Sequence, residues 1–235
     1  MLTITGIKEC FEWLIQILLA VFYPPICPYC NSFMKPNRYA CRDCTRKIPL
    51  SGFWSVAFGG YRCIAPFIYE GIFKDAVHRF KFGNKPQFAR FLAEPMLYVV
   101  SRQYANIDLV TCVPLHEKNL KERGYNQSKL LAKRIAKRMG IPYLDALKKI
   151  KNNQLQHYQL KSERENNVKN VYIAINKENL YNKNILLCDD ILTTGHTLGV
   201  CAEKLRECGA KKVFCVTVCI VIPDTGADII YEVHE

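Results

Sequence analysis

Residues 185–198 read Ile185-Leu186-Leu187-Cys188-Asp189-Asp190-Ile191-Leu192-Thr193-Thr194-Gly195-His196-Thr197-Leu198, and this stretch decides the fold. An apolar run without polar alternation predicts a buried parallel strand. Ligands of open α/β sheets bind at the carboxyl ends of such strands, where the two acids lie. The Thr/Gly loop offers hydroxyls and backbone N–H groups to a phosphate at the start of the next helix. We therefore expect a ligand with a phosphate for the loop and with hydroxyls, or a metal, for the acids. The alternative is that the carboxylates only cap a helix.

The same stretch resembles the phosphoribosyl-pyrophosphate signature of type I phosphoribosyltransferases. In that signature an apolar strand leads to two acids, two further residues and a Thr-Thr/Ser-Gly-x-Thr loop, and every position is matched here. The resemblance implies that Asp189 and Asp190 hold the ribose hydroxyls of phosphoribosyl pyrophosphate. It also implies that a loop holds the 5′-phosphate, and the loop residues are Thr193, Thr194, Gly195, His196 and Thr197.

The chain has 235 residues and a formal net charge of +12. Such a charge favours a polyanionic partner, either nucleic acid or an anionic membrane surface, although a solvated basic surface is the alternative. Residues 116–151 hold eleven Lys or Arg residues against three acidic ones, and a localised excess argues more strongly for a polyanion. We expect a DNA surface on one face of a helix at 125–139, made of Lys129, Lys133, Arg134, Lys137 and Arg138.

Residues 3–22 have apolar side chains at helical spacing and end at Pro24-Pro25, which predicts an amphipathic helix. This helix packs on the core or lies on a membrane surface or partner. The apolar run 13–22 is too short to span a membrane and lacks the features of a signal peptide. Most cysteines outside the N-terminal cluster lie in apolar contexts, which favours buried thiols in a reducing compartment. We therefore expect a cytoplasmic protein, in solution or peripheral to the inner face of the membrane.

Two Cys-x-x-Cys pairs, Cys27/Cys30 and Cys41/Cys44, are separated by ten residues. Four thiolates this close predict a closed structural zinc site, whereas a redox pair needs only one such motif. Around them lie Lys35, Arg38, Arg42, Arg46 and Lys47, together with Tyr29, Phe33 and Tyr39. This mixture of cations and aromatic rings suits single-stranded nucleic acid, and a solvated surface is the alternative.

The remaining patterns predict an α/β fold, with a mostly parallel sheet flanked by helices after a small zinc module and a β-hairpin. We expect four segments: an amphipathic helix at 1–24, a zinc module at 25–50, a hood-like hairpin and helices at 51–105, and a phosphoribosyltransferase-like domain at 106–235. A polar stretch at 151–170 is expected to be a mobile lid. The other expected elements are strands at 53–58, 61–69, 109–114, 143–150, 171–175, 185–188 and 213–218, helices at 71–82, 88–104, 125–139 and 197–208, and a loop at 115–124.

Further motifs narrow the resemblance. They are Lys81-Phe82-Gly83, Val113-Pro114-Leu115, Arg123-Gly124-Tyr125-Asn126-Gln127 and the loop that ends at residues 163–168. With the four cysteines and the signature, they resemble the ComF family of competence proteins over nearly the whole chain. That family is associated with the handling of single-stranded DNA in natural transformation. The resemblance implies competence helicase or membrane-channel partners. It places the pyrophosphate of the ligand, with Mg²⁺, near residues 113–124, where Arg123 and Arg164 are the expected cations.

Three functions remain open on these grounds. The first is a DNA-handling competence protein that binds phosphoribosyl pyrophosphate, and we favour it. The second is an active phosphoribosyltransferase with an unknown acceptor, in which Asp189, Asp190, Arg123 and Arg164 would form the catalytic set. In that case positioning, Mg²⁺ and cationic groups would carry catalysis. The third is a regulator that senses the ligand without turnover.

Overall fold

The computed structural model describes residues 25–35, 38–49, 52–151, 171–222 and 229–232. The chain divides into two compact units, Met1–Ile48 and Pro49–Glu235. The predicted helix at 3–22, and the predicted lid except Lys151, lie outside the described residues. Among the helices of the described residues, none has the length and apolarity needed to cross a membrane.

The N-terminal unit is built around its four cysteines. The chain turns back on itself after Cys27, whose backbone N–H donates to the carbonyl of Ser32, and Ile26 and Phe33 form an antiparallel bridge. A single helical turn, α2 (Arg42–Thr45), follows Cys41. Among the described residues of this unit, the buried apolar ones are few: Cys27, Pro28, Tyr29, Met34, Ala40 and Cys44. Because so small a core contributes little stability, a bound metal would supply much of the folding free energy.

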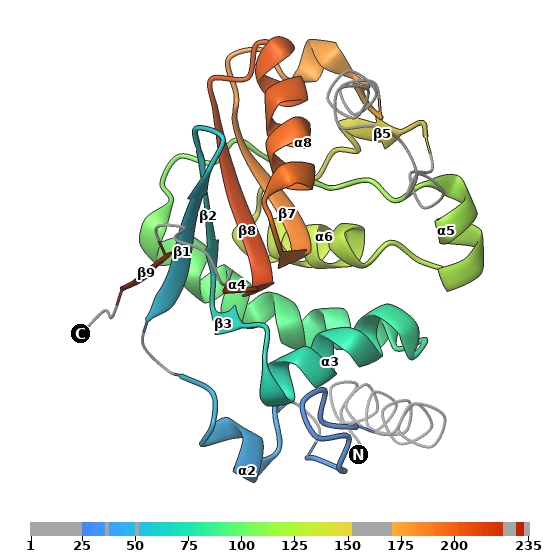
Figure 1. The fold of residues 1–235 in the computed structure, drawn as a ribbon, viewed down its shortest axis with the longest axis vertical. Helices are drawn as coiled ribbons and strands as arrows, with labels where there is room; N and C mark the ends of the chain where they lie inside the picture. The colour runs from blue at the N-terminus through green and yellow to red at the C-terminus, as the bar shows by residue number, and fades with distance from the viewer. Residues whose placement is uncertain (1–24, 36–37, 50–51, 152–170, 223–228, 233–235) are drawn as a thin grey trace, which may run out of the picture. The chain divides into compact units, whose positions relative to one another are not determined.

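The larger unit has a mixed, mostly parallel sheet in the order β4-β7-β8-β2-β1-β9, with β3 pairing on β8 (Figure 1). β7 is parallel to both of its neighbours, and β8 is parallel to β2 and β3, whereas β1 is antiparallel to β2 and β9. The strands are β1 (Phe53–Phe58), β2 (Tyr61–Ala65), β3 (Phe67–Ile68), β4 (Leu109–Cys112), β7 (Asn184–Leu192), β8 (Lys212–Ile220) and β9 (Ile229–Glu232). A separate two-stranded sheet pairs β5 (Leu147–Lys149) with β6 (Tyr172–Ala174).

The predicted hairpin is confirmed, and its Gly59-Gly60 turn has positive φ at both residues, which glycine adopts without strain. The hairpin lies in the main sheet, because β2 pairs in parallel with β8. Residues 53–65 therefore share a sheet with the strands of the expected phosphoribosyltransferase-like domain. The four expected segments stay a prediction about domain organisation.

Helices cover both faces of the sheet (Figure 1). Helix α8 (His196–Glu207) lies in front in that view and buries Leu198, Cys201 and Leu205 in a core that includes Leu187 and Cys215. Helices α4 (Ala89–Gln103) and α6 (Gln127–Met139) pack against each other behind the sheet. The remaining helical segments of the described chain are α3 (Gly71–Phe82), η1 (Pro86–Phe88), α5 (Glu117–Arg123) and η3 (Lys177–Asn179).

Three local predictions were wrong. The expected loop at 115–124 contains α5, which begins with the His116 ring capping the N–H of Lys118 and ends at Gly124 with φ +77°. The expected strand at 143–150 is confined to β5, because only residues 147–149 pair with β6. Finally, β7 continues to Leu192, so Asp189 and Asp190 lie inside the paired strand and not beyond it, since β8 is long enough to pair there.

Candidate functional site

The two acids of the signature are fixed by contacts with helices. Ser128, in the first turn of α6, donates its hydroxyl to Asp189 Oδ1 at 2.7 Å, and the backbone N–H of Asp190 donates to the same oxygen at 2.8 Å. Lys81 Nζ of α3 lies 3.2 Å from Asp190 Oδ2, and this ion pair is largely shielded from solvent. The carboxylates of neighbouring residues are therefore held by two different helices.

Lys81 and Ser128 were not singled out as site residues from the sequence. Lys81 belongs to the Lys81-Phe82-Gly83 motif, so a signal for it was present in the chain. Ser128 directly follows the Arg-Gly-Tyr-Asn-Gln motif, but a serine in a helix carries no recognisable pattern of its own. Both roles become visible only when the helices are placed against β7.

The Thr/Gly loop connects β7 to α8. Gly195 is the N-cap of α8 with φ +75°, and a Cβ atom at this position would lie 2.5 Å from Phe58 Cγ. Glycine is therefore required both by backbone conformation and by the close approach of the hairpin. Thr193, Thr194 and His196 are exposed, so their polar groups are accessible at the rim. The N–H groups in the first turn of a helix lack intrahelical acceptors and attract phosphate.

The acids and the loop line a common cavity of about 210 Å³. It is bounded by Lys81, Asp189, Asp190, Ile191, Leu192, Thr193, Gly195, Thr197 and Leu198. The lining thus combines a carboxylate pair, which can accept hydrogen bonds from hydroxyls, with the N-terminal end of α8, which attracts phosphate. The structure thus brings together all of the predicted loop residues except Thr194 and His196, which are next to the lining residues in sequence.

The electrostatics of this cavity centre on Asp189. Burial and the neighbouring Asp190 charge raise the pKa of Asp189 to about 7 from the ordinary 3.8, although Ser128, the Asp190 N–H and Lys81 act in the opposite direction. A carboxyl group with this pKa changes its charge near neutral pH. A ligand that donates hydroxyl hydrogen bonds would bind the ionised form better.

Arg123, one of the two predicted cations, does not line this cavity. Arg123 is the last residue of α5, and its guanidinium lies 5.0 Å from the centre of the Phe82 ring. It is therefore next to the residue that follows Lys81, but it does not line the cavity with the acids. Arg164 lies outside the described residues. The roles of Arg123 and Arg164 stay predictions.

The basic face of α6 is largely engaged by other side chains. Arg134 and Arg138 both lie within 3.6 Å of Glu94 Oε1, and Lys129 Nζ lies 2.7 Å from Asp145 Oδ2. Lys133 lies over the ring of Tyr143 at 5.6 Å from its centre. Lys137 is the exposed member of the predicted set without such a contact among the described residues. Its role, and that of the whole face as a DNA surface, stays a prediction.

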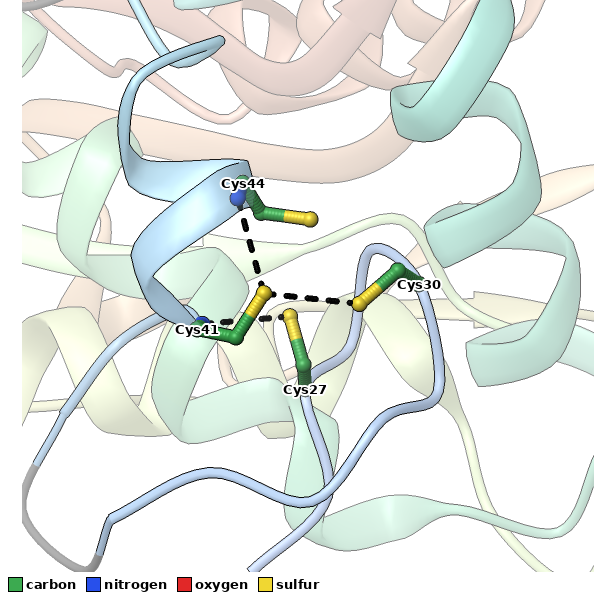
Figure 2. A group of neighbouring side chains, drawn as sticks. All are labelled: Cys27, Cys30, Cys41 and Cys44. Carbon is green, nitrogen blue, oxygen red and sulfur yellow. Dashed lines mark hydrogen bonds between the residues drawn. The ribbon is translucent and has the colours of Figure 1, made fainter.

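The four N-terminal cysteines form a candidate metal centre, and Figure 2 shows their sulfurs pointing toward one another. All four Sγ atoms lie within 4.8 Å of one another, and Cys30 Sγ is 3.5 Å from Cys41 Sγ. A zinc ion with four Zn–S bonds of about 2.3 Å requires sulfurs about 3.8 Å apart, so the thiols fit it. Although burial raises the pKa of Cys30, hydrogen bonds from Ser32 and the neighbouring cysteines bring it to about 6.

Several known proteins are similar in sequence to this chain. Residues 126–233 match the family model of the phosphoribosyl transferase domain. Competence protein F of Haemophilus influenzae is 29% identical over 197 residues, which cover 80% of this chain and 82% of that protein. Competence protein ComFC of Streptococcus pneumoniae is 29% identical, with 80% and 77% covered. DNA utilization protein YhgH of Escherichia coli is 24% identical over 224 residues, with 91% and 96% covered.

The parallel sheet, the signature loop and the matching domain define a phosphoribosyltransferase-like protein. The similarity to the relatives extends well beyond that domain and includes the region of the four cysteines. The chain is thus a homologue of competence protein F, competence protein ComFC and DNA utilization protein YhgH, and it carries a phosphoribosyltransferase-like domain.

Proposed function

We propose that this protein binds phosphoribosyl pyrophosphate with Mg²⁺ and handles single-stranded DNA during natural transformation. The observation that carries the ligand assignment is that Asp189 and Asp190 line one cavity together with residues of the Thr/Gly loop at the start of α8. The acids would accept hydrogen bonds from the ribose hydroxyls. The loop hydroxyls and the first N–H groups of α8 would hold the 5′-phosphate.

The chain's own residues prepare this site in two ways. Ser128 and the Asp190 N–H orient Asp189 so that its second oxygen is free for the ligand. Lys81 offsets the charge of buried Asp190 and adds a cation to the cavity wall. Mg²⁺ would enter with the pyrophosphate and offset its charge. Zinc on the four N-terminal thiolates would be structural, because a tetrahedral Cys₄ site leaves no open position.

The DNA assignment is supported by the relatives, which are named for competence and for DNA utilization. A family role in DNA uptake agrees with the net charge of +12, since a basic protein attracts a polyanion. We place the protein on the cytoplasmic side, where imported single strands and competence helicase or membrane-channel partners would be met.

The decisive experiment is isothermal titration of phosphoribosyl pyrophosphate with Mg²⁺ into the full chain. The Asp189→Asn/Asp190→Asn variant keeps the shape of the site and should bind at least 10-fold more weakly, because charged hydrogen bonds contribute about 1.5–3 kcal/mol each. The matched control is Asp75→Asn/Glu203→Gln, which removes two exposed carboxylates that do not line the cavity and should bind like the wild type. Absence of binding to the wild type, or equal loss in both variants, would reject the ligand site.

The same samples address turnover. Pyrophosphate released over hours in the presence of candidate bases or amines would indicate an active transferase. Binding without release, together with a change of DNA affinity on addition of the ligand, would indicate a ligand-sensing role. The proposal of binding holds in either case.

A further inference from the structure

We propose that a basic groove beside the zinc cluster binds single-stranded DNA. The inference deepens the proposed function, because it assigns the DNA to a particular surface of the N-terminal unit. The groove encloses about 520 Å³. It is lined by Phe33, Met34, Ala40, Cys41 and Thr45, and by four residues that we call the groove cations: Lys35, Arg38, Arg42 and Arg46.

The groove cations are available to a polyanion. All four are exposed, and no carboxylate of the described residues lies within ion-pair distance of them. The face of α6 differs, since Lys129, Arg134 and Arg138 are already paired with acids. A DNA phosphate that approaches α6 must compete with these carboxylates, whereas one that approaches the groove replaces only water and counterions. The lack of acidic partners among the described residues therefore favours the groove as the DNA surface.

The local charge supports the same assignment. The described residues of the N-terminal unit hold five Lys or Arg residues against one acid, Asp43. A zinc ion with four thiolates would add two negative charges, which leaves the unit positive. Arg42 and Arg46 are four residues apart, about one helical turn of 5.4 Å, so their side chains lie on the same side of α2. Two guanidinium groups in this arrangement can bind phosphate oxygens in a bidentate way.

An exposed aromatic ring distinguishes the groove from a merely basic surface. Phe33 lines the groove and is 80% exposed, and Tyr39 nearby in sequence is 51% exposed. The backbone of Phe33 is fixed by its bridge with Ile26, so the ring is presented from an ordered segment. An exposed ring beside phosphate-binding cations suits unpaired bases, which stack on aromatic side chains. Duplex DNA does not offer such bases, and a lipid headgroup has no flat face to stack.

The first test is fluorescence anisotropy of full-length zinc-loaded protein with labelled oligo(dT) of about 16 nucleotides, the upper site size of one small single-strand-binding fold. The groove variant replaces all four groove cations by alanine. We expect at least a 10-fold loss of affinity, and a salt slope reduced by about 3, because each phosphate contact to a single strand contributes about 0.7. Zinc content and phosphoribosyl pyrophosphate affinity should stay at wild-type values, which shows that the variant is folded.

The matched control removes the same charge from exposed lysines of the other unit: Lys177, Lys183, Lys211 and Lys212. It should retain wild-type affinity for DNA. A third variant, Lys133→Ala/Lys137→Ala, tests the face of α6 without unpairing Glu94. If the groove variant binds DNA like the charge-matched control, or if the α6 variant alone loses affinity, the groove assignment is overturned.

The role of Phe33 is tested with Phe33→Ala on two probes of equal charge, oligo(dT) and an abasic strand of the same length. We expect about a 10-fold loss on oligo(dT) and little change on the abasic strand, because stacking needs a base. Equal effects on both probes would refute the stacking contact.

The outcomes separate this inference from the function on which it rests. If the wild type binds no single-stranded DNA, both the DNA part of the proposed function and the groove assignment fail. If the wild type binds and the groove variant is unchanged, only the groove assignment fails. Binding of the wild type and of the groove variant to vesicles with anionic phosphatidylglycerol is the last measurement. A groove variant that loses vesicle binding but keeps DNA binding would overturn the inference and assign the groove to a membrane surface.

Discussion

Removal of the Ser128 hydroxyl should shift the pH dependence of ligand binding toward higher pH. In the wild type, Asp189 has a pKa of about 7, because burial and the Asp190 charge raise it while Ser128 partly counteracts them. The ionised fraction of this carboxyl is about 0.9 at about pH 8 and about 0.1 at about pH 6. If the ligand needs the carboxylate, its affinity should fall about 10-fold over that interval.

The size of the shift follows from the hydrogen bond. Ser128 is buried, and its hydroxyl donates to Asp189 Oδ1 at 2.7 Å. Such a bond to a charged group contributes about 1.5–3 kcal/mol, and one pKa unit corresponds to about 1.4 kcal/mol. Ser128→Ala should therefore raise the pKa of Asp189 by at least about one unit. Near neutral pH the carboxyl becomes mostly protonated, and phosphoribosyl pyrophosphate should bind about fivefold more weakly, whereas the affinities should converge at about pH 9.

The assay is isothermal titration with phosphoribosyl pyrophosphate and Mg²⁺ at several pH values between about 6 and 9. Asp189→Asn is the control, since it removes the titrating group and leaves only the titration of the ligand's own phosphates, whose pKa is about 6. The reasoning is refuted if the wild type has the same pH profile as Asp189→Asn. A Ser128→Ala profile that is unchanged or moved to lower pH would refute the assigned role of the hydroxyl.

Three further predictions test the loop, the stability of the site and the metal centre. Gly195→Ala should lower the melting temperature and weaken ligand binding, because its Cβ would lie 2.5 Å from Phe58. The control Gly199→Ala in α8, whose Cβ would lie 3.7 Å from the same ring, should be neutral or stabilising. Equal effects of the two substitutions would contradict this prediction. Asp189→Asn should raise the melting temperature more at about pH 8 than at about pH 5. A carboxyl with a raised folded-state pKa loses stability as pH rises through that pKa, so a larger gain at low pH would reject the assignment. Elemental analysis should find one zinc per chain. Cys44→Ser should lower the zinc content and make the N-terminal unit sensitive to proteolysis, because the metal stabilises its fold. A metal-free wild type that resists proteolysis would disprove the structural role of zinc.

Several elements were predictable because their signals are local. Gly59-Gly60 supplies the positive φ values of the hairpin turn, and helix α3 was predicted with its observed bounds, residues 71–82. For α6, apolar spacing indicated the buried stripe, which includes Leu131 and Ile135. In each case the information lies within a few residues, because backbone conformation and amphipathic periodicity are short-range properties.

The α5 segment and β7 show where local signals fall short. Residues 115–124 looked like a loop, yet the cap formed by His116 and the turn at Gly124 allow a short helix. The sequence of β7 suggested that the strand ends before the acids, but pairing with β8 extends it to Leu192. A partner strand supplies hydrogen bonds that no local pattern reveals, so strand ends are set by pairing and not by composition.

The sequence alone determined which groups are available in this protein: four thiols at zinc spacing, two adjacent acids, a Thr/Gly loop and an excess of cations. The tertiary structure decided which of them act together. It placed Lys81 against Asp190 and Ser128 against Asp189, and it paired Glu94 with two arginines of α6. Within the part of the chain that the structure describes, the groove cations have no acidic partner. The physical reason is that the pKa of a carboxyl or the availability of a cation depends on neighbours within a few ångströms, and the chain brings most of these neighbours from distant positions.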